Sequence, residues 1–541
     1  MTFTSGDVQG GRARTETTIL LVVGTGGFTH AAPVLELGRI LSTRGHRVAF
    51  ATHKGQEKWI EGASFSFLSD VFTMGPPMDP EIETAHYLQM QNSDIRKNYR
   101  DYFRPKFNVD AFWASDYPFL KDICEEFKPD MIVADFFVDS AVRDIKHQTG
   151  IPIATVWPQM PYAMVGASYI PGLPGFQVDA LTSEYASLWT RIRAAFRPLR
   201  ALSAVIPYLR FVREMRRKAG IDYTLPILKK PDYLVLVNSF WGLETPKDLP
   251  PLVAPIGPIL SEDFEPLSDP LEKFFTDHHR VVYVSFGTHI RVAPRDLTKF
   301  VGAFSKLLEE GLIDGIIWAA NDAQRQLFDP DQIVRYKGMD IKMSDILDNH
   351  DPAWFFTPFA PQRAVLACHD TILFVTHGGG SSVNEAIFHE TPMLALSFFF
   401  DQLLNGLRIQ EAGIGLALDK ANFSENEILE KSRVLLQDKN GTIAQDVRRM
   451  GHVAQVSARK KEFGADLIEE VLYDYRFSLV PPGATAGESG HRRRPMHLQT
   501  ADARMSAWKA QNWDLTSLAV ASVAIAGYLS WRMVDMLRTR A

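Results

Sequence analysis

A stretch of small and polar residues follows an apolar run at Thr371 and has the composition of a phosphate-binding turn. It reads TILFVTHGGGSSVNEA, so the apolar run ends in His377, three glycines, Ser381 and Ser382. Glycines at a strand-to-helix turn let the backbone approach a ligand, and the first N–H groups of the following helix can hold an anion. The serine and histidine side chains can donate further hydrogen bonds. The pattern predicts a diphosphate cradle that needs no metal, with a ligand-free glycine turn as the alternative.

Two better-known glycine motifs do not fit the sequence. A P-loop needs Gly-Lys-Ser/Thr, which the chain does not contain. A dinucleotide-binding fingerprint needs a third glycine, but the turn GTGGFTH in the first half has Thr29 at that place. Both motifs are therefore excluded.

His30 and Asp135 form a second pair that could do chemistry. His30 follows the predicted buried strand TTILLVVG after a short turn. Asp135 ends the predicted strand in DMIVADFF. A histidine near neutral pH is a natural general base, and a carboxylate can fix its tautomer and stabilise the imidazolium. A lone histidine in a turn is more often a surface or capping residue, and this alternative stays open on the residues alone. The neighbouring Asp139 is interpreted as a helix start.

Two α/β domains would position these groups. Short apolar runs alternate with helix-length amphipathic segments in both halves, which is typical of parallel sheets. Helices are predicted over Pro33–Arg44, Asp139–Thr149 and Pro294–Glu310, and DYLVLVNS is predicted as the last strand of the first half. ETPKDLPPLVAPIGPI, with five prolines, is interpreted as an interdomain linker. Two doubly wound sheets would leave a ligand cleft between the carboxyl ends of their strands.

The composition limits the class of protein. A chain of 541 residues favours two globular units, and a net charge of −6 argues against a nucleic-acid binder. Two cysteines, Cys124 and Cys368, cannot build a disulfide framework or a cysteine-rich zinc site. Asp329-Pro-Asp331 has an Asp-x-Asp pattern that could hold a cation, but its surroundings are those of a surface turn, so no metal is expected.

The C-terminal region predicts a membrane anchor. Leu515–Trp531 has no charged residue over 17 positions, the lower limit for crossing a bilayer. Trp513 and Trp531 bracket this segment as interface residues do. The alternative is a buried core helix.

The two predicted domains are expected to lie on the cytosolic side of the membrane. Three arginines beyond the span favour a cytoplasmic C-terminus, which would put the domains in the lumen. However, Ile19–Val23 is too short for the core of a signal peptide, and translocating two large domains requires a signal. We therefore expect a tail-anchored protein at the endoplasmic reticulum, with the glycosylation sequences at Asn422 and Asn440 unused.

The segment from Phe359 to Gln402 resembles the signature of the family 1 UDP-glycosyltransferases. That signature has an aromatic residue before Ala-Pro-Gln, then Thr-His-x-Gly, a small polar pair, Glu-Ala, Pro-Met and Asp-Gln. The chain shows FAPQRAVL, THGG, SS, EA, TPML and DQLLN in this order and at matching spacing. VVYVSFGT, VNSFWGLE, APIGPI and GFTHAAPVLELGRILSTRGHRVAFAT also resemble the family, which extends the resemblance to about Thr18–Leu472. It implies a GT-B fold, two Rossmann-like domains facing a cleft, and a UDP-sugar donor without a cofactor.

The resemblance also implies roles for single residues. His30 would be the catalytic base and Asp135 its support. Phe359 and Gln362 would lie beside the uracil, and Glu385 would accept both ribose hydroxyls. The other donor-binding residues would be Ser285, Gly287, Thr288, Pro361, His377, Gly379, Ser381, Ser382, Asp401 and Gln402, the last two at the sugar hydroxyls. For Phe359, plain core packing is the alternative.

Three positions depart from the family pattern. Many members have tryptophan where Phe359 stands, and asparagine is usual where Ser381 stands. Gly380 occupies a place that is tryptophan in plant members. The resemblance therefore does not fix the choice of sugar.

Taken together, the sequence predicts inverting transfer of a sugar, glucose first, from a UDP-sugar to a small hydrophobic alcohol or phenol, such as a secondary metabolite or xenobiotic. VFTMGPPMDP, YRDYFRPKFNVDAFWASDYPF and SYIPGLPGF could line an apolar acceptor pocket or simply pack loops. One alternative is a membrane sterol or sphingolipid glycosyltransferase, which the anchor and the basic, apolar Arg191–Lys218 favour. Another is a non-catalytic UDP-sugar-binding membrane subunit.

The expected domain boundaries follow from these assignments. They are 1–17 for a flexible N-terminus, 18–245 for an acceptor-binding domain, 246–275 for a linker, 276–478 for a UDP-sugar-binding domain with a terminal helix, 479–512 for a polar linker and 513–534 for the transmembrane anchor.

Overall fold

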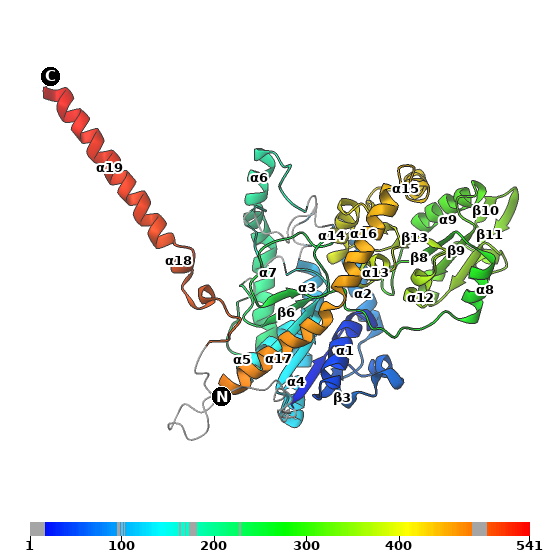
Figure 1. Ribbon diagram of the computed structural model, residues 1–541, viewed down its shortest axis with the longest axis horizontal. Helices are drawn as coiled ribbons and strands as arrows, with labels where there is room; N and C mark the ends of the chain where they lie inside the picture. The colour runs from blue at the N-terminus through cyan, green and yellow to red at the C-terminus, as the bar shows by residue number, and fades with distance from the viewer. Residues whose placement is uncertain are drawn as a thin grey trace, which may run out of the picture.

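The computed structural model describes residues 17–94, 98, 101, 103–161, 164–167, 169–171, 181–226, 229–478 and 495–540. Two parallel sheets with flanking helices make up the globular part (Figure 1). The predicted flexible segment 1–17 lies outside the described residues except for Thr17, as do parts of the predicted linker 479–512 and most of SYIPGLPGF.

The N-terminal sheet has seven strands in the order β3-β2-β1-β4-β5-β6-β7. The strands are β1 (Thr18–Val22), β2 (Arg47–Thr52), β3 (Leu68–Thr73), β4 (Met131–Asp135), β5 (Ile153–Trp157), β6 (Leu234–Val237) and β7 (Val253–Pro255). The prediction that DYLVLVNS closes this sheet was wrong, because β7, inside the proline-rich linker, pairs with β6. Proline is tolerated there because β7 is an edge strand.

The C-terminal sheet has six strands in the order β12-β9-β8-β13-β14-β15. They are β8 (Val281–Ser285), β9 (Gly315–Ala319), β12 (Trp354–Thr357), β13 (Thr371–Thr376), β14 (Met393–Leu396) and β15 (Gly415–Leu418). A separate hairpin, β10 (Ile333–Tyr336) and β11 (Met339–Lys342), was not predicted. Asp329 and Asp331 lie in an exposed turn just before it.

The inner strands of both sheets are buried on both faces, which explains their continuous apolar sequences. In β1, Leu20 and Val22 contribute to one core and Ile19 and Leu21 to another. Because successive side chains point to opposite faces, a strand buried on both sides needs apolar residues throughout. Chain order reverses beside β1 in one sheet and beside β8 in the other, and ligands of such sheets bind at these switch points.

Helices flank the sheets. In the N-terminal half they are α1 (Phe28–Thr43), α2 (Pro80–Asn92), α3 (Arg104–Asp110), α4 (Trp113–Phe127), α5 (Asp139–Thr149), α6 (Leu188–Ala195) and α7 (Arg197–Lys218). In the C-terminal half they are α8 (Asp269–Asp277), α9 (Pro294–Glu309), α10 (Asp322–Arg325), α11 (Met343–Leu347), α12 (Gln362–Ala367), α13 (Gly380–Phe388), α14 (Asp401–Glu411), α15 (Glu425–Gln437) and α16 (Thr442–Ser457). The three helices predicted from the sequence correspond to α1, α5 and α9.

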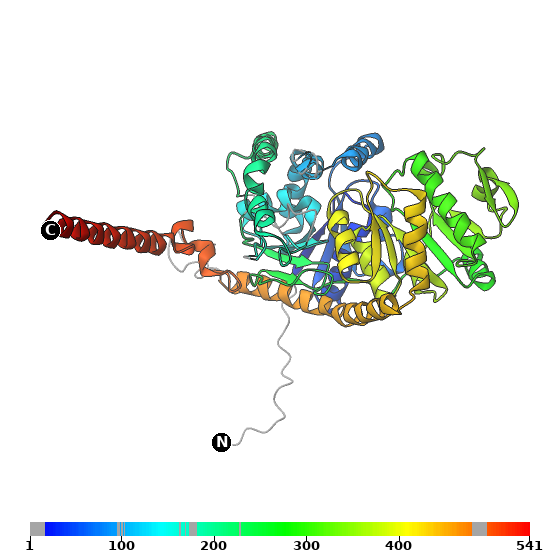
Figure 2. The same cartoon turned by 90° about the horizontal axis from the view of Figure 1, so that it is seen from above.

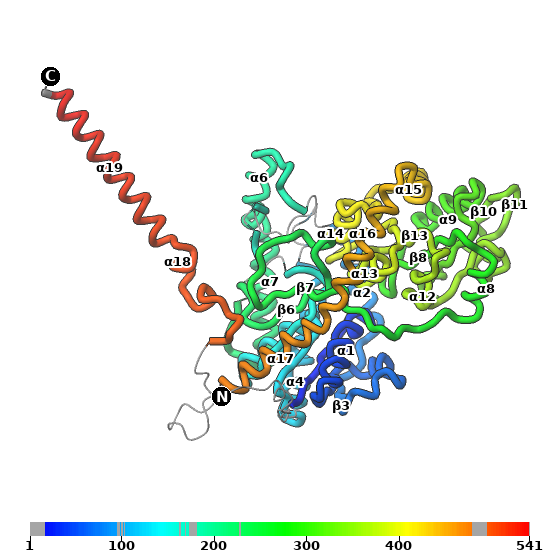
Figure 3. Tube along the Cα trace, in the orientation of Figure 1, coloured from blue at the N-terminus to red at the C-terminus, as the bar shows by residue number. Residues whose placement is uncertain are grey.

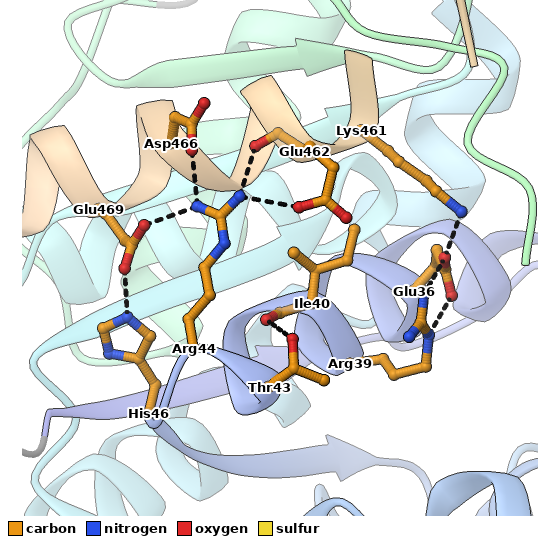
Figure 4. Close-up of polar contacts among 10 residues, drawn as sticks. All are labelled: Glu36, Arg39, Ile40, Thr43, Arg44, His46, Lys461, Glu462, Asp466 and Glu469. Carbon is orange, nitrogen blue, oxygen red and sulfur yellow. Dashed lines mark hydrogen bonds and ion pairs between the residues drawn. The ribbon is translucent and has the colours of Figure 1, made fainter. Parts of the chain in front are cut away.

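After α16 the chain returns to the N-terminal domain. Helix α17 (Lys460–Ser478), placed with the C-terminal domain in the expected boundaries, lies along α1 (Figure 3). Its acidic side bonds Arg44, with Glu462 at 2.8 Å, Asp466 at 2.7 Å and Glu469 at 2.6 Å (Figure 4). On the same helix, Lys461 bonds Glu36 at 2.7 Å. The two domains are therefore held together by a crossing at this helix as well as by the linker.

The last helix leaves the globular part. Beyond the short α18 (Ala507–Ala510), α19 (Trp513–Arg540) projects away from the sheets (Figure 2). Over Trp513–Thr539 it is long and apolar enough to cross a membrane, and none of that window is buried. The alternative of a buried core helix is therefore wrong.

Candidate active site

His30 and Asp135 meet at the carboxyl ends of β1 and β4, which are neighbours in the sheet. The Nδ1 atom of His30 lies 3.0 Å from Oδ1 of Asp135. The other carboxylate oxygen, Oδ2, accepts the backbone N–H of Phe137 at 2.9 Å, so the carboxylate is held in place. When Nδ1 donates to Asp135, Nε2 carries the lone pair, which is the tautomer that a general base needs.

The turn before His30 depends on Gly26. The φ angle of Gly26 is 98°, in the region that favours glycine. A Cβ atom at this position would also lie only 2.4 Å from Cδ2 of His30. Backbone conformation and the closeness of the imidazole therefore both require glycine here.

The electrostatic surroundings raise the pKa of His30. Burial lowers this pKa, but the charge and hydrogen bond of Asp135, with a further contribution from Asp401, outweigh burial. Asp401 belongs to the C-terminal domain, so carboxylates of both domains act on one imidazole. The pKa of Asp401 is itself raised by burial, against the opposing N–H of Gly380 and the charge of His30.

Aromatic rings from both domains surround His30. The ring of Phe137 stacks on the imidazole with centroids 4.3 Å apart, and Phe136 lies at 6.0 Å. From the C-terminal domain, Phe400 packs against Phe137 at 5.8 Å. The φ angle of Phe400 is 52°, which is unusual for a bulky residue and marks local strain directly before Asp401.

The glycine-serine turn has the predicted strand–turn–helix form. Strand β13 ends at Thr376, and α13 begins at Gly380 with Gly379 as its N-cap. Gly378 has a φ of 79°, which glycine adopts without strain. The N–H of Gly380 donates to Asp401 at 2.9 Å, so that carboxylate lies at the start of α13.

His377 lies between two glycine backbones. A Cβ atom at Gly287 would approach its ring to 2.9 Å, and one at Gly379 would approach to 2.5 Å. Burial lowers the pKa of His377 to about 4, with a backbone contact at Ser285 opposing, so the ring is neutral at pH 7. Within the part of the chain that the structure describes, its buried Nδ1 has no hydrogen-bond partner. This nitrogen is therefore an unsatisfied buried polar atom directly before the glycines of the turn.

The predicted nucleoside residues lie on α12, α13 and the loop before them. Phe359 is 66% exposed, so the alternative of plain core packing is wrong. Pro361 is the N-cap of α12, and Gln362 donates to Glu385 at 2.6 Å and to Ser382 at 3.2 Å. Burial raises the pKa of Glu385, against the opposing hydrogen bond from Gln362.

The other predicted donor residues differ in exposure. Ser285 ends β8, next to β13, while Gly287 and the exposed Thr288 follow it. Gln402 is 6% exposed, and its Oε1 accepts the backbone N–H groups of Phe398 and Phe399 at 3.1 and 3.3 Å. Its side-chain carbonyl thus supports the loop before α14, and only its amide N–H groups could reach a sugar.

The two halves of the site touch each other. The hydroxyl of Ser381 donates to the backbone oxygen of Thr29 at 3.3 Å. This contact joins the glycine-serine turn directly to the residue before His30. The structure therefore brings the glycine-serine turn and the histidine–aspartate pair together where the two domains meet.

Comparisons with known proteins show the family to which the chain belongs. The sequence profile described as UDP-glucoronosyl and UDP-glucosyl transferase matches residues 223–442. A UDP-glycosyltransferase of Talaromyces amestolkiae is 38% identical over 95% of this chain and 96% of its own. UDP-glycosyltransferase FPY2 of Fusarium mangiferae is 36% identical over 96% of this chain and 98% of its own. The chain belongs to the family 1 UDP-glycosyltransferases.

Solved structures place this UDP-glycosyltransferase in the GT-B fold. The kitacinnamycin glycotransferase matches with a TM-score of 0.56 and 20% identity, over 84% of this chain and 98% of the other. A Polygonum tinctorium UDP-glucosyltransferase that glucosylates indoxyl matches with a TM-score of 0.55 and 18% identity, over 84% and 99%. At these identities the likeness concerns the fold alone.

Sequence reasoning missed one residue that organises the site of this UDP-glycosyltransferase. Asn405 donates from Nδ2 to the backbone oxygen of Gly378 at 2.9 Å and to Asp401 at 3.2 Å. Its side-chain oxygen accepts from Arg408 at 2.7 Å. The signal was present in DQLLN, because residues four apart on a helix share one face.

Proposed function

We propose that this UDP-glycosyltransferase transfers glucose from UDP-glucose to a hydroxyl of a small lipophilic acceptor, with inversion at the anomeric carbon. The observation that carries the proposal is the His30–Asp135 pair, whose Nδ1–Oδ1 distance is 3.0 Å, beside the glycine-serine turn. A binding subunit would need the turn but not the base.

The proposed reaction is a single displacement. Nε2 of His30 takes the acceptor proton while the acceptor oxygen forms a bond to the anomeric carbon. The bond from that carbon to the diphosphate oxygen breaks, and UDP leaves. Asp135 stabilises the imidazolium that forms. The N–H groups at the start of α13, together with Ser382 and His377, stabilise the negative charge of the leaving diphosphate by hydrogen bonds.

A neutral sugar suits the proposed sugar subsite. Asp401 lies at the start of α13, where it accepts the N–H of Gly380. A carboxylate at this position can accept hydroxyl hydrogen bonds from glucose but repels the carboxylate of a glucuronosyl donor. The rings of Phe136, Phe137 and Phe400 near His30 favour an apolar acceptor.

The activity can be tested by UDP release from the full chain in detergent, with UDP-glucose and a panel of phenols, sterols and ceramides. Acceptor-dependent release that is lost in the His30→Ala variant would support the proposal and identify the acceptor class. Binding of UDP-glucose without release, for every acceptor and every other UDP-sugar, would instead favour the non-catalytic subunit. Release with sterols or ceramides alone would favour the lipid glycosyltransferase.

Glu385 should determine the affinity for the ribose of the donor. We expect Glu385→Ala to weaken UDP binding about 10- to 100-fold, since a hydrogen bond to a charged group contributes about 1.5–3 kcal/mol. Calorimetric titration with UDP and 2′-deoxy-UDP measures the effect. The deoxy ligand, which keeps only its 3′-hydroxyl contact, should lose less affinity in the variant than UDP does, and an equal loss for both would contradict contact with the 2′-hydroxyl. Glu430→Ala, at a side chain 67% exposed on α15, serves as the control.

Transfer should not depend on a metal ion. Among the residues that the structure describes, no group of three or more His, Cys, Asp and Glu could hold one. We expect the rate to be unchanged after dialysis against a chelator, because backbone N–H groups and neutral side chains are proposed to stabilise the diphosphate. Loss of activity that added Mg²⁺ or Mn²⁺ restores would contradict this prediction.

We further propose that α19 anchors the enzyme in a membrane, with the catalytic domains facing the cytosol at the endoplasmic reticulum. The exposed apolar helix Trp513–Thr539 supports the anchor. Resistance to alkaline carbonate extraction tests it. The orientation is tested at Asn422 and Asn440, which are both exposed. An endoglycosidase-sensitive shift in mass would contradict the cytosolic orientation.

A further inference from the structure

Helices α6 and α7 carry a band of exposed apolar side chains, here called the α6–α7 face. Its members are between 37% and 74% exposed: Leu188, Trp189, Ile192, Phe196, Leu199, Leu202, Ile206 and Leu209. The structure divides the basic, apolar segment Arg191–Lys218 between two helices at Phe196, with Pro198 in the first turn of α7. Contiguous exposed apolar surface of this kind marks a binding surface in a soluble domain.

The apolar residues occupy one side of α7. Leu199, Leu202 and Ile206 recur at spacings of three and four, so they share a face of the helix. The opposite side is formed by buried residues that pack on α3 and α4, among them Tyr208 and Val212. Because α7 already has a buried side of its own, the α6–α7 face is a second, outward-facing apolar side.

Basic residues accompany this face. Exposed cations on the two helices include Arg191, Arg193, Arg210, Arg213, Arg217 and Lys218. Glu214 is the one acidic residue in the sequence between positions 185 and 218, and it pairs with Arg217 at 2.9 Å. Apolar side chains beside cations match the interface of an anionic bilayer. The same charge disfavours a symmetric contact with a second copy, which would bring two basic faces together.

The base of α19 is attached to the domain that carries this face. Lys230, which follows α7 in the chain, bonds Asp502 at 2.6 Å and Thr500 at 3.3 Å. Lys229 donates to the backbone oxygen of Ala503 at 3.2 Å. Both views show α19 leaving on the side of α6 and α7, opposite the β10–β11 hairpin (Figures 1 and 2).

We propose that the α6–α7 face docks on the headgroup region of an anionic phospholipid bilayer. The apolar side chains enter the boundary between headgroups and acyl chains, while the arginines bind lipid phosphates. That this bilayer is the one that α19 enters depends on the proposed anchor. The lipid contact itself is inferred from α6 and α7 alone. Docking places the acceptor-binding domain against the membrane, where lipophilic acceptors are dissolved.

A fluorescent label on the face can test the proposal in the full chain. Leu202→Cys carries an environment-sensitive fluorophore, and the protein is reconstituted into vesicles of phosphatidylcholine with or without phosphatidylserine. Met339→Cys, 51% exposed on the distant β10–β11 hairpin, is the matched control. The wild-type chain, treated with the same fluorophore, shows how much label is taken up by Cys124 and Cys368. Flotation of the vesicles after a carbonate wash tests α19 separately, and UDP-glucose turnover in detergent confirms that each variant is folded.

We expect a blue shift and higher intensity at position 202 on vesicles with phosphatidylserine, and no change at position 339. Reversing charge by Arg210→Glu, Arg213→Glu and Arg217→Glu together should remove the shift without preventing flotation. A solvent-like signal at position 202 on vesicles that float would overturn docking while leaving the anchor intact. An equal shift on neutral vesicles would overturn the selection for anionic lipid. A shift in detergent that grows with protein concentration would assign the face to a second copy.

Discussion

The His30→Ala enzyme is expected to turn over about 10²- to 10⁴-fold more slowly than the wild type, the usual loss for a positioned general base. Its affinity for UDP-glucose should not change. The base acts only on the acceptor oxygen, while the proposed donor contacts come from α12, α13 and α14 of the other domain. The loss should therefore appear in kcat and kcat/KM together, as for an interaction made only in the transition state.

Single-turnover rates and calorimetric binding of UDP-glucose separate these two effects. His350→Ala is the matched control, because that imidazole is 71% exposed and lies before β12 in the C-terminal domain. Near-full turnover of His30→Ala on the same acceptor would mean that another group takes the proton. A parallel loss of donor binding would instead indicate that the substitution disturbs the contact between Thr29 and Ser381.

Much of the site can be predicted from the sequence because it lies at strand ends. His30, Asp135 and His377 each come after or at the end of a buried strand, so each parallel sheet brings its own residues to the edge at the carboxyl ends of its strands. What the sequence does not contain is how these groups pair across space. The bond from Gln362 to Glu385 depends on how α12 packs on α13, and the contact from Ser381 to Thr29 depends on how the domains meet.

The missed elements also have physical reasons. β7 is short, at the edge of its sheet and inside a proline-rich stretch, so it lacks the periodicity of a buried strand. The β10–β11 hairpin had a signal in Lys337 and Gly338, whose φ angles of 50° and 73° suit a tight hairpin turn. The position of α17 has no local signal, because its partners Arg44 and Glu36 are more than four hundred residues away in the chain.

Several contacts join the N-terminal and C-terminal domains close to His30. Tyr87 of α2 stacks on His289 with centroids 3.9 Å apart, and Gln91 exchanges hydrogen bonds with the backbone of Arg291. Phe400 reaches Phe137 beside the imidazole. The position of the loops around His289 and Phe400 is therefore tied to that of the N-terminal domain, including the ring that stacks on His30.

Asp135→Asn should lower kcat by about 10²- to 10³-fold and should change the pH dependence in a defined direction. Only neutral His30 can accept a proton, so the wild-type rate falls as the pH drops below the His30 pKa, which lies above its ordinary value of 6.5. Without the Asp135 charge, burial dominates and this pKa falls. The acid limb of kcat/KM should therefore move to lower pH in the variant.

The loss of rate has a second cause in the geometry. The backbone N–H of Phe137 needs an acceptor, and the amide that replaces the carboxylate in Asp135→Asn can supply only its carbonyl oxygen. The amide N–H groups then face Nδ1 of His30, which becomes an acceptor and leaves the proton on Nε2, the atom that must receive one. Asp401→Asn is the comparison, because Asp401 raises the His30 pKa by charge alone and less than Asp135 does. In Asp401→Asn the acid limb of kcat/KM should move in the same direction by a smaller amount, because Asp135 still holds the proton of His30 on Nδ1. If the acid limb of kcat/KM did not move in Asp135→Asn, that limb would reflect the titration of a group other than His30.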